Sequence, residues 1–209
     1  MGTKILQIVL LITATQFLFG SSCNKDGSKP CRDARYGFSV TSEFSPQKEI
    51  YNVGDTIFLT STIPKTLTDL ISNQQIDYSN NLGIGGTVGI GLIDSVNHKF
   101  EVGTDSFNFL STNGNISIGS NKVLNISFAE TSAGFLLKIK LIVNAKGNYI
   151  IGVSDLYSQG IKNQDCTNAG FSMFVNNNNK HFDILTNANI PGVTLDAQRI
   201  STNYCFRVQ

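Results

Sequence analysis

Alternating apolar and polar residues recur along the chain and indicate β-strands. The clearest run is 135–143, in which every second position is Phe, Leu, Ile, Leu or Val, and Lys138 and Lys140 lie between them. A second run, 149–153, follows a turn at 145–148 that contains glycine and asparagine. We therefore expect these two runs to pair as a hairpin at the centre of the core.

Shorter runs of the same kind fill most of the remaining chain. They lie at 36–41, 56–63, 88–92, 100–102, 107–109, 116–118, 124–128, 171–175, 182–185 and 204–208. Only 66–72 and 195–200 have apolar residues at a spacing that suits a short helix. Many short strands with Gly and Asn turns predict an all-β fold, an immunoglobulin-like two-sheet sandwich over residues 34–209, with a closed lipocalin-like β-barrel as the alternative.

The stretch 82–94 is dense in glycine, and its spacing excludes a nucleotide-binding loop. Counting from Gly83, the third glycine of a dinucleotide-binding motif is replaced by Val88, and no lysine follows to form a phosphate loop. Val88, Ile90 and Leu92 instead alternate with glycine. This pattern predicts a strand with one smooth face, on which another backbone can approach closely.

The N-terminal segment 1–22 has the features of a secretory signal. Lys4 precedes an apolar run at 5–19 that is shorter than the ~20 residues of a membrane-spanning helix, and small residues lead to Cys23. Gly20-Ser21-Ser22-Cys23 followed by a polar tether at 23–33 resembles the lipobox of bacterial lipoproteins. The resemblance implies that Cys23 becomes the acylated first residue and that the membrane is a partner through this N-terminal lipid.

Two further resemblances concern the domain itself. Val53-Gly54-Asp55-Thr56 at the start of a strand is similar to the second strand of bacterial immunoglobulin-like surface modules. The Asn-rich strands, the relaxed lipobox and the closing residues 204–208 together resemble uncharacterised Bacteroidota lipoproteins with an immunoglobulin-like β-sandwich. These resemblances imply a cell-envelope location, at the outer membrane, on either its periplasmic or its surface face, and they transfer no activity.

Charge excludes one class of partner. Lys and Arg number 16 against 15 Asp and Glu, and loss of Lys4 with the signal segment leaves 15 against 15. A neutral domain lacks the electrostatic attraction on which nucleic-acid binding depends. We therefore expect no nucleic-acid partner.

Four cysteines leave an odd number once Cys23 is assigned to lipid. In an oxidising compartment two of the remaining three are expected to pair. Cys166 and Cys205 are the preferred pair, because both flank the last predicted strands, whereas Cys31 lies beside the tether and could compete for either.

No constellation of catalytic or metal-binding residues stands out. The two histidines, His98 and His181, are not in metal-ligand spacing. Asp155 and Asp165 border a long loop and offer oxygen ligands for calcium, but they lack the regular spacing of a calcium loop. We expect no cofactor.

The functional expectation is a non-enzymatic binding or assembly module anchored in the cell envelope, with a protein or glycan partner. The long polar loops at 73–82 and 155–170 are the predicted binding elements. Trp is absent, so a carbohydrate-binding site would depend on the 6 tyrosines. Two alternatives stay open: a carrier with an apolar ligand inside a barrel, and a hydrolase whose carboxylates meet only in the fold.

Overall fold

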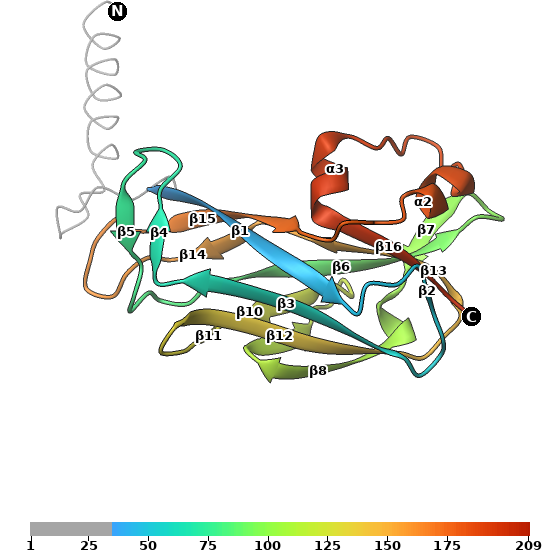
Figure 1. Cartoon of the computed structure of the whole chain (residues 1–209), viewed down its shortest axis with the longest axis horizontal. Coiled ribbons are helices and arrows are strands. Elements are labelled where there is room, and N and C mark those ends of the chain that lie inside the picture. Colours follow the sequence, from blue (N-terminus) through green and yellow to red (C-terminus); the bar gives the residue numbers. More distant parts are fainter. Residues whose placement is uncertain (1–34) are drawn as a thin grey trace, which may run out of the picture. The chain divides into compact units, whose positions relative to one another are not determined.

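The computed structural model describes residues 35–209. The predicted signal segment, Cys23, Cys31 and the tether therefore lie outside the described residues. The described residues belong to one compact unit, and its strands run lengthwise through the domain (Figure 1).

The first layer of the domain includes two ten-residue strands, 36–45 and 134–143. Its strands are β1 (Tyr36–Ser45), β3 (Thr56–Pro64), β8 (Phe107–Asn113), β11 (Ala129–Glu130), β12 (Gly134–Val143) and β15 (Ala169–Val175). Their order is β8–β12–β3–β1–β15, with β11 also paired to β12. β1 and β15 are parallel, and the other pairs of this layer are antiparallel.

The second layer is built around the glycine-rich strand. Its strands are β2 (Ile50–Tyr51), β6 (Gly85–Asp94), β7 (Lys99–Val102), β9 (Asn115–Ile118), β10 (Leu124–Ser127), β13 (Gly147–Val153) and β16 (Asn203–Val208). Their order is β9–β10–β6–β13–β16–β2, and β7 pairs with the second half of β6. A separate hairpin is formed by β4 (Thr66–Thr68) and β5 (Gln75–Asp77).

A short strand joins the two layers. β14 (Leu156–Ser158) pairs with β15 on one side and, through Tyr157 and Gly85, with β6 on the other. In the part of the chain that the structure describes, β2 at one end of the strand path does not pair with β8 or β11 at the other. The predicted two-sheet sandwich is therefore confirmed, and the closed barrel, with its interior ligand site, is wrong.

Aromatic and aliphatic side chains fill the space between the layers. The long strand β12 shows the alternation most clearly, because from Phe135 to Val143 every second residue is buried. Phe44 of β1 stacks on Tyr204 of β16 with ring centroids 5.2 Å apart and an interplanar angle of 15°. Such contacts between strands of opposite layers hold the sandwich together.

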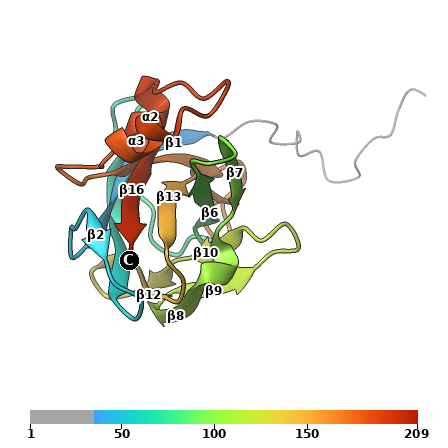
Figure 2. The ribbon, with the colours of Figure 1, turned by 90° about the vertical axis from the view of Figure 1, so that its right-hand side faces the viewer.

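Two short helices lie over the outer side of β16 (Figures 1 and 2). α2 (Asp183–Ala188) buries Ile184 and Leu185 against Ile93, Ile150 and Cys205, which face away from the main core. α3 (Ala197–Thr202) begins at Asp196, whose carboxylate accepts a hydrogen bond from Arg199 N. The helical turn predicted at 195–200 is confirmed.

Three local expectations are wrong. The segment 66–72 is β4 and the tip of the hairpin instead of a helix, since Leu67 is buried but Leu70 and Ile71 are exposed. The apolar run at 182–185 begins helix α2. The runs 135–143 and 149–153 belong to opposite layers, because β12 pairs with β3 and β8 while β13 pairs with β6 and β16.

The predicted disulfide between Cys166 and Cys205 is also wrong. Cys205 carries a free thiol, whereas Cys166 is disulfide-bonded. Cys205 lies under α2, in the cluster with Ile93 and Ile150. Cys166 lies in the loop between β14 and β15, at the end of the sandwich where β1 begins. The remaining cysteines of the chain lie outside the described residues.

Candidate binding site

An open groove of about 440 Å³ lies on the outer face of the second layer. We call it the glycine groove, after the residues of its floor. Its lining consists of Gly89, Ile90, Gly91, Phe100, Glu101, Val102, Asn121, Lys122, Val123, Ile150, Gly152, Arg199 and Asn203. The volume falls within the range usual for small-molecule sites, about 300–1,000 Å³.

The floor exists because glycine alternates with buried residues in β6. Val88 and Ile90 face the core, and Gly89 and Gly91 therefore face outward. A Cβ atom at Gly89 would meet no atom within 4 Å, whereas one at Gly91 would lie 3.0 Å from Ile150 Cγ2. The prediction of a strand with one smooth face is confirmed, and the groove is the result.

On one side the wall is β7. Phe100 is 37% exposed and Val102 is more exposed still, so both offer apolar surface to the groove. Gly103 N donates a hydrogen bond to Ile90 O at 2.9 Å. A Cβ atom at Gly103 would lie 3.0 Å from Gly91 C, a tight contact, so glycine favours this close approach to β6.

The opposite wall is the end of α3. Asn203 donates from Nδ2 to Arg199 O at 2.8 Å, which fixes its side chain at the start of β16. A Cβ atom at the neighbouring Gly152 would lie 2.4 Å from Asn203 Oδ1, so glycine makes room for this amide. A second hollow of about 280 Å³ shares Arg199 and Asn203 with the groove.

Arg199 differs from the other charged residues of the groove, Lys122 and Glu101, because those two form ion pairs. Lys122 Nζ lies 2.9 Å from Asp105 Oδ1, and Glu101 Oε1 lies 2.8 Å from Lys99 Nζ, where the hydrogen bond also raises the pKa of Lys99. Arg199 Nε, by contrast, is buried and finds no hydrogen-bond acceptor within residues 35–209. A buried N–H left unpaired costs roughly 1–3 kcal/mol. Arg199 is therefore a positive side chain in the groove lining that makes no ion pair within residues 35–209.

The histidines lie outside the groove. His98 Nδ1 is 2.7 Å from Ala188 O, at the end of α2. His181 lies 3.8 Å from Glu49 Oε2 and packs its ring against Tyr204. Both make contacts that position the helical cover of the sheet.

The acidic residues considered for calcium do not form a site. Asp155 lines a hollow beside α3, and Asp165 is exposed in the loop before β15. Over residues 35–209, no group of three or more His, Cys, Asp or Glu side chains is placed to hold a metal ion.

The tyrosines expected for sugar binding are mostly in the core. Tyr51, Tyr78, Tyr149 and Tyr204 are fully buried. The aromatic side chain that reaches the groove is Phe100 instead. The sequence gives only an indirect indication of this exposed ring. The alternation at 100–102 is short, as in an edge strand, and an edge strand leaves side chains exposed.

The two long loops meet at the other end of the domain. Asn81 and Ile161 form a β-bridge, and Leu82 N donates to Gly160 O at 2.7 Å. Tyr78 is buried beneath them and donates to Thr167 O at 2.9 Å. These loops are therefore packed against each other, and the glycine groove lies on a sheet face away from them.

None of the helices within the described residues is both long and apolar enough to cross a bilayer.

Comparison with known proteins gives structural likeness alone. No protein-family model matches the chain, and no curated protein matches it in sequence. A type II cohesin domain from the cellulosome of Acetivibrio cellulolyticus is similar at 14% identity and a TM-score of 0.35, over 65% of this chain and 91% of that one. The human F-spondin reeler domain is similar at 9% identity and a TM-score of 0.35, over 87% of this chain and 96% of that one. Values of this size establish neither a family nor a function.

Proposed function

We propose that this protein is a lipid-anchored module of the bacterial cell envelope that binds a uronic-acid saccharide in the glycine groove, without catalysis. The observation that carries the proposal is the partly exposed guanidinium side chain of Arg199, which lies in the wall of an open groove and makes no ion pair within residues 35–209. A carboxylate is the acceptor that suits it best, because hydrogen bonds between ionised groups are the strong ones.

The remaining surface of the groove suits a sugar ring. Phe100 supplies an exposed aromatic ring, and the glycine floor lets a flat ligand lie against the sheet. Asn121 and Asn203 supply amide groups, which can both donate and accept hydrogen bonds to hydroxyls. A volume of about 440 Å³ lies in the usual range of small-ligand sites and accommodates a short saccharide.

The location follows from the N-terminal sequence. Small residues lead to Cys23, and a polar tether of 23–33 separates it from the domain. Acylation of Cys23 would anchor the mature chain stably, since more than one acyl chain satisfies the two-signal requirement. The proposed location is the outer membrane of a Bacteroidota-type cell.

A role as a hydrolase has less support. A general acid at neutral pH needs a carboxyl group whose pKa is raised. Here hydrogen bonds from the backbone N–H groups of Asn52 and Asn97 lower the pKa of Asp55 and Asp94 respectively.

The binding test uses three immobilised polymers and the mature protein. Polygalacturonate presents carboxylates on sugar rings, fully methyl-esterified polygalacturonate presents the same rings without charge, and polyglutamate presents carboxylates on a peptide. We expect binding to the first polymer alone. Arg199→Gln should weaken it tenfold to a hundredfold, which corresponds to roughly 1.5–3 kcal/mol for a charged hydrogen bond.

A matched pair of glycine variants tests the place of binding. Both Gly89 and Gly170 lie on strands, and a Cβ atom at either would meet nothing within 4 Å. Gly89→Leu fills the groove and should abolish binding, whereas Gly170→Leu lies on the first layer and should leave it unchanged. Binding to polyglutamate instead, equal effects of the two variants, or no binding to either acidic polymer would each overturn the proposal.

Anchoring is tested separately. Cys23→Ala should release the protein from the membrane fraction or leave it unprocessed, and mass spectrometry of the mature N-terminus should find acylated Cys23. An unmodified N-terminus would refute the anchor. Protease treatment of intact cells then determines which face of the outer membrane carries the domain.

A further inference from the structure

Two adjacent aliphatic side chains project from the tip of the β4–β5 hairpin. Leu70 is 63% exposed and Ile71 is 72% exposed. Tight turns of this kind usually carry Gly, Pro, Asn, Asp or Ser. From Leu70 to Ile76 the tip has no charged residue. An uncharged tip with two neighbouring aliphatic residues favours contact with an apolar phase.

The tip is held firmly against the start of β1. Asp69 is buried and accepts a hydrogen bond from Gly37 N at 2.8 Å. Its other carboxylate oxygen accepts from Ser72 N at 2.8 Å and from Ser72 Oγ at 2.6 Å. Leu70 N also donates to Gly37 O at 2.7 Å. The orientation of Leu70 and Ile71 is therefore fixed by the fold.

Burial opposes the charge on Asp69, but the hydrogen bonds from Ser72 and Gly37 outweigh it. The pKa of this carboxyl group is consequently held below its usual value. The carboxylate thus stays ionised at neutral pH, inside the turn that it organises. The charge lies beneath the tip, and the aliphatic side chains lie on the outside.

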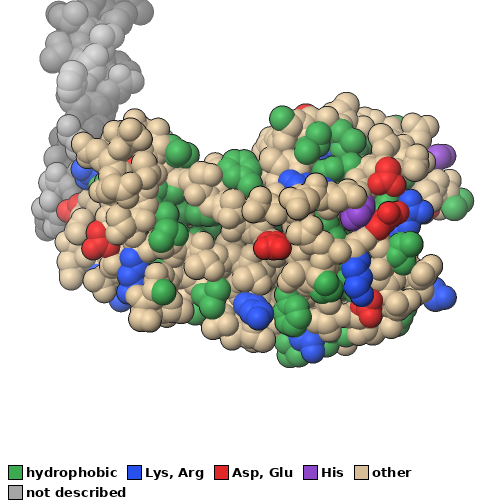
Figure 3. Space-filling view, in the orientation of Figure 1, with side chains coloured by type: hydrophobic (Ala, Val, Ile, Leu, Met, Phe, Trp, Pro, Cys, Tyr) green, Lys and Arg blue, Asp and Glu red, His purple; other side chains and the backbone are tan. Residues whose placement is uncertain are grey.

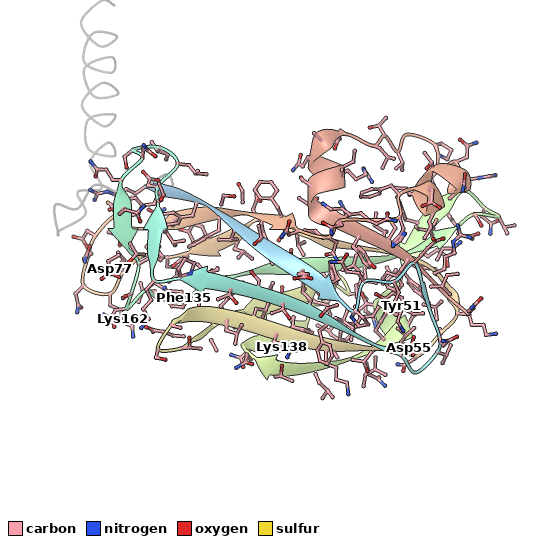
Figure 4. The ribbon with its side chains drawn as sticks, viewed as in Figure 1. Tyr51, Asp55, Asp77, Phe135, Lys138 and Lys162 are labelled. Atoms are coloured by element: carbon pink, nitrogen blue, oxygen red, sulfur yellow. The ribbon has the colours of Figure 1, made fainter. Side chains whose placement is uncertain are left out.

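The place of the hairpin makes the bilayer its natural neighbour. Gly37 is two residues from Arg35, where the described chain begins. Cys23 is 12 residues before Arg35, so a fully extended tether spans about 40 Å at most. Figure 4 shows Asp77 and Lys162 at this end of the domain, and Tyr51 and Asp55 at the other.

The same end rises beside a hollow in the surface. Figure 3 shows two raised parts, formed by the hairpin and by the helical segment, with a lower region between them. Leu70 and Ile71 therefore belong to a projecting part of the surface. A projection can touch a flat bilayer without the rest of the domain entering it.

We propose that Leu70 and Ile71 insert into the interfacial layer of the membrane that holds the N-terminal lipid, as a second contact that orients the domain. The inference rests on the lipid anchor proposed above. Two side chains bind a membrane weakly by themselves, but a short tether raises their effective concentration at the surface. The partner that contacts the hairpin tip is thus a lipid surface.

The absence of Trp from the sequence allows a direct test. Ile71→Trp places one fluorophore at the tip of the full-length, lipidated protein. The protein is reconstituted into vesicles of phosphatidylethanolamine and phosphatidylglycerol, with and without brominated acyl chains. We expect the Trp emission to shift to shorter wavelength on reconstitution and to be quenched by the brominated lipid.

The matched control is Val96→Trp. Val96 is 84% exposed in the turn between β6 and β7. Figure 1 shows this turn at the opposite end of the domain from the β4–β5 hairpin. The same lipidated protein with Trp at this position should show neither the shift nor the quenching. In the lipidated protein without any Trp substitution, amide hydrogen exchange should also slow at 69–76 on reconstitution and remain unchanged at 95–98.

Three outcomes would overturn the inference. Equal quenching at both positions would indicate no fixed orientation, and no quenching at position 71 in vesicle-bound protein would leave the anchor intact but the tip in water. An emission of Ile71→Trp that shifts with protein concentration in detergent, before vesicles are added, would indicate that a second copy covers the tip. Failure of the protein to float with vesicles is a separate result, because it contradicts the anchor itself.

Discussion

The hydroxyl oxygens of Tyr51 and Tyr204 lie 3.5 Å apart inside the core. Each is hydrogen-bonded to the segment that connects β1 to β2: Tyr51 donates to Pro46 O, and Tyr204 donates to Lys48 O at 2.8 Å. Lys48 N in turn lies 3.2 Å from the hydroxyl of Tyr51 and 3.1 Å from that of Tyr204. The two tyrosines therefore attach this connection to β16.

Tyr204→Phe should lower the free energy of unfolding by about 1–2 kcal/mol, because Lys48 O then loses its donor while the packing of the ring is kept. Denaturant unfolding measures the change. Tyr157→Phe is the control, because Tyr157 is half exposed and its hydroxyl accepts only a long bond, 3.4 Å, from Asn168 Nδ2. A loss of equal size in the two variants would contradict this account.

Stability should fall as pH rises above about 9. Burial raises the pKa of Cys205 from 9.0 to about 12 and also raises the pKa of Tyr204 and Tyr51 above 10.0. In the unfolded chain these groups ionise near their ordinary values, so the unfolded state binds fewer protons at high pH. The free energy of unfolding therefore decreases with pH in this range.

Denaturant midpoints measured from neutral to alkaline pH test this dependence. In Cys205→Ala the decline should begin nearer pH 10, the ordinary value for the tyrosines. A profile that stays level through this range in the unsubstituted protein would contradict the burial of these groups.

The thiol of Cys205 should be inert in the native protein. It is fully buried beside Ile93 and Leu185, and its raised pKa leaves little thiolate at neutral pH. Iodoacetamide should label Cys205 in denaturant without reductant but not in buffer. Peptide mapping without reductant should find Cys166 in a disulfide-linked peptide that lacks Cys205. A linked Cys166–Cys205 peptide would contradict the free thiol of Cys205.

Arg199→Met should raise the free energy of unfolding by about 1 kcal/mol while it weakens saccharide binding. The substitution removes a buried N–H that has no acceptor among the described residues, and Met keeps the apolar length of the side chain. Thermal unfolding of the free protein and binding to polygalacturonate are measured on the same sample. A drop in stability would indicate that Arg199 has a structural role.

Most strands could be predicted from the sequence because alternation reports which face of a strand is buried. β3 and β12 follow this rule along most of their length, whereas in β6 and β16 the helical cover also buries Ile93 and Cys205 on the outer side. Partners of strands are a different matter, since pairing joins residues that are far apart in the chain. β12 and β13 are connected by a short turn, yet they lie in opposite layers.

Short elements could not be predicted from alternation in the same way. β14 has three residues, too few to show a period, and it lies in a segment predicted to be a polar loop. In 66–72 the spacing of Leu67, Leu70 and Ile71 suits a helix, but the last two residues are exposed at a hairpin tip. Periodicity indicates an apolar face and does not show whether that face is buried.

The floor of the glycine groove could be predicted from the sequence, but its wall at Arg199 could not. The alternation of Gly89 and Gly91 with apolar residues in 88–92 predicts the smooth floor of the groove. Arg199 could not be predicted, because its position beside Gly152 depends on the pairing of β13 with β16 and on the placement of α3. Both are consequences of the tertiary fold.

The parallel pairing of β1 with β15 also determines when the chain can fold. Tyr36 pairs with Ala169, 133 positions later (169 − 36 = 133). During synthesis from the N-terminus, β1 has no neighbour on that side until residue 175 has been made, and the second layer lacks β16 for longer still. Folds dominated by such distant contacts form slowly, in milliseconds to seconds. The domain therefore cannot be completed while its C-terminal strands are still being made, and the first strands stay without their partners during most of synthesis.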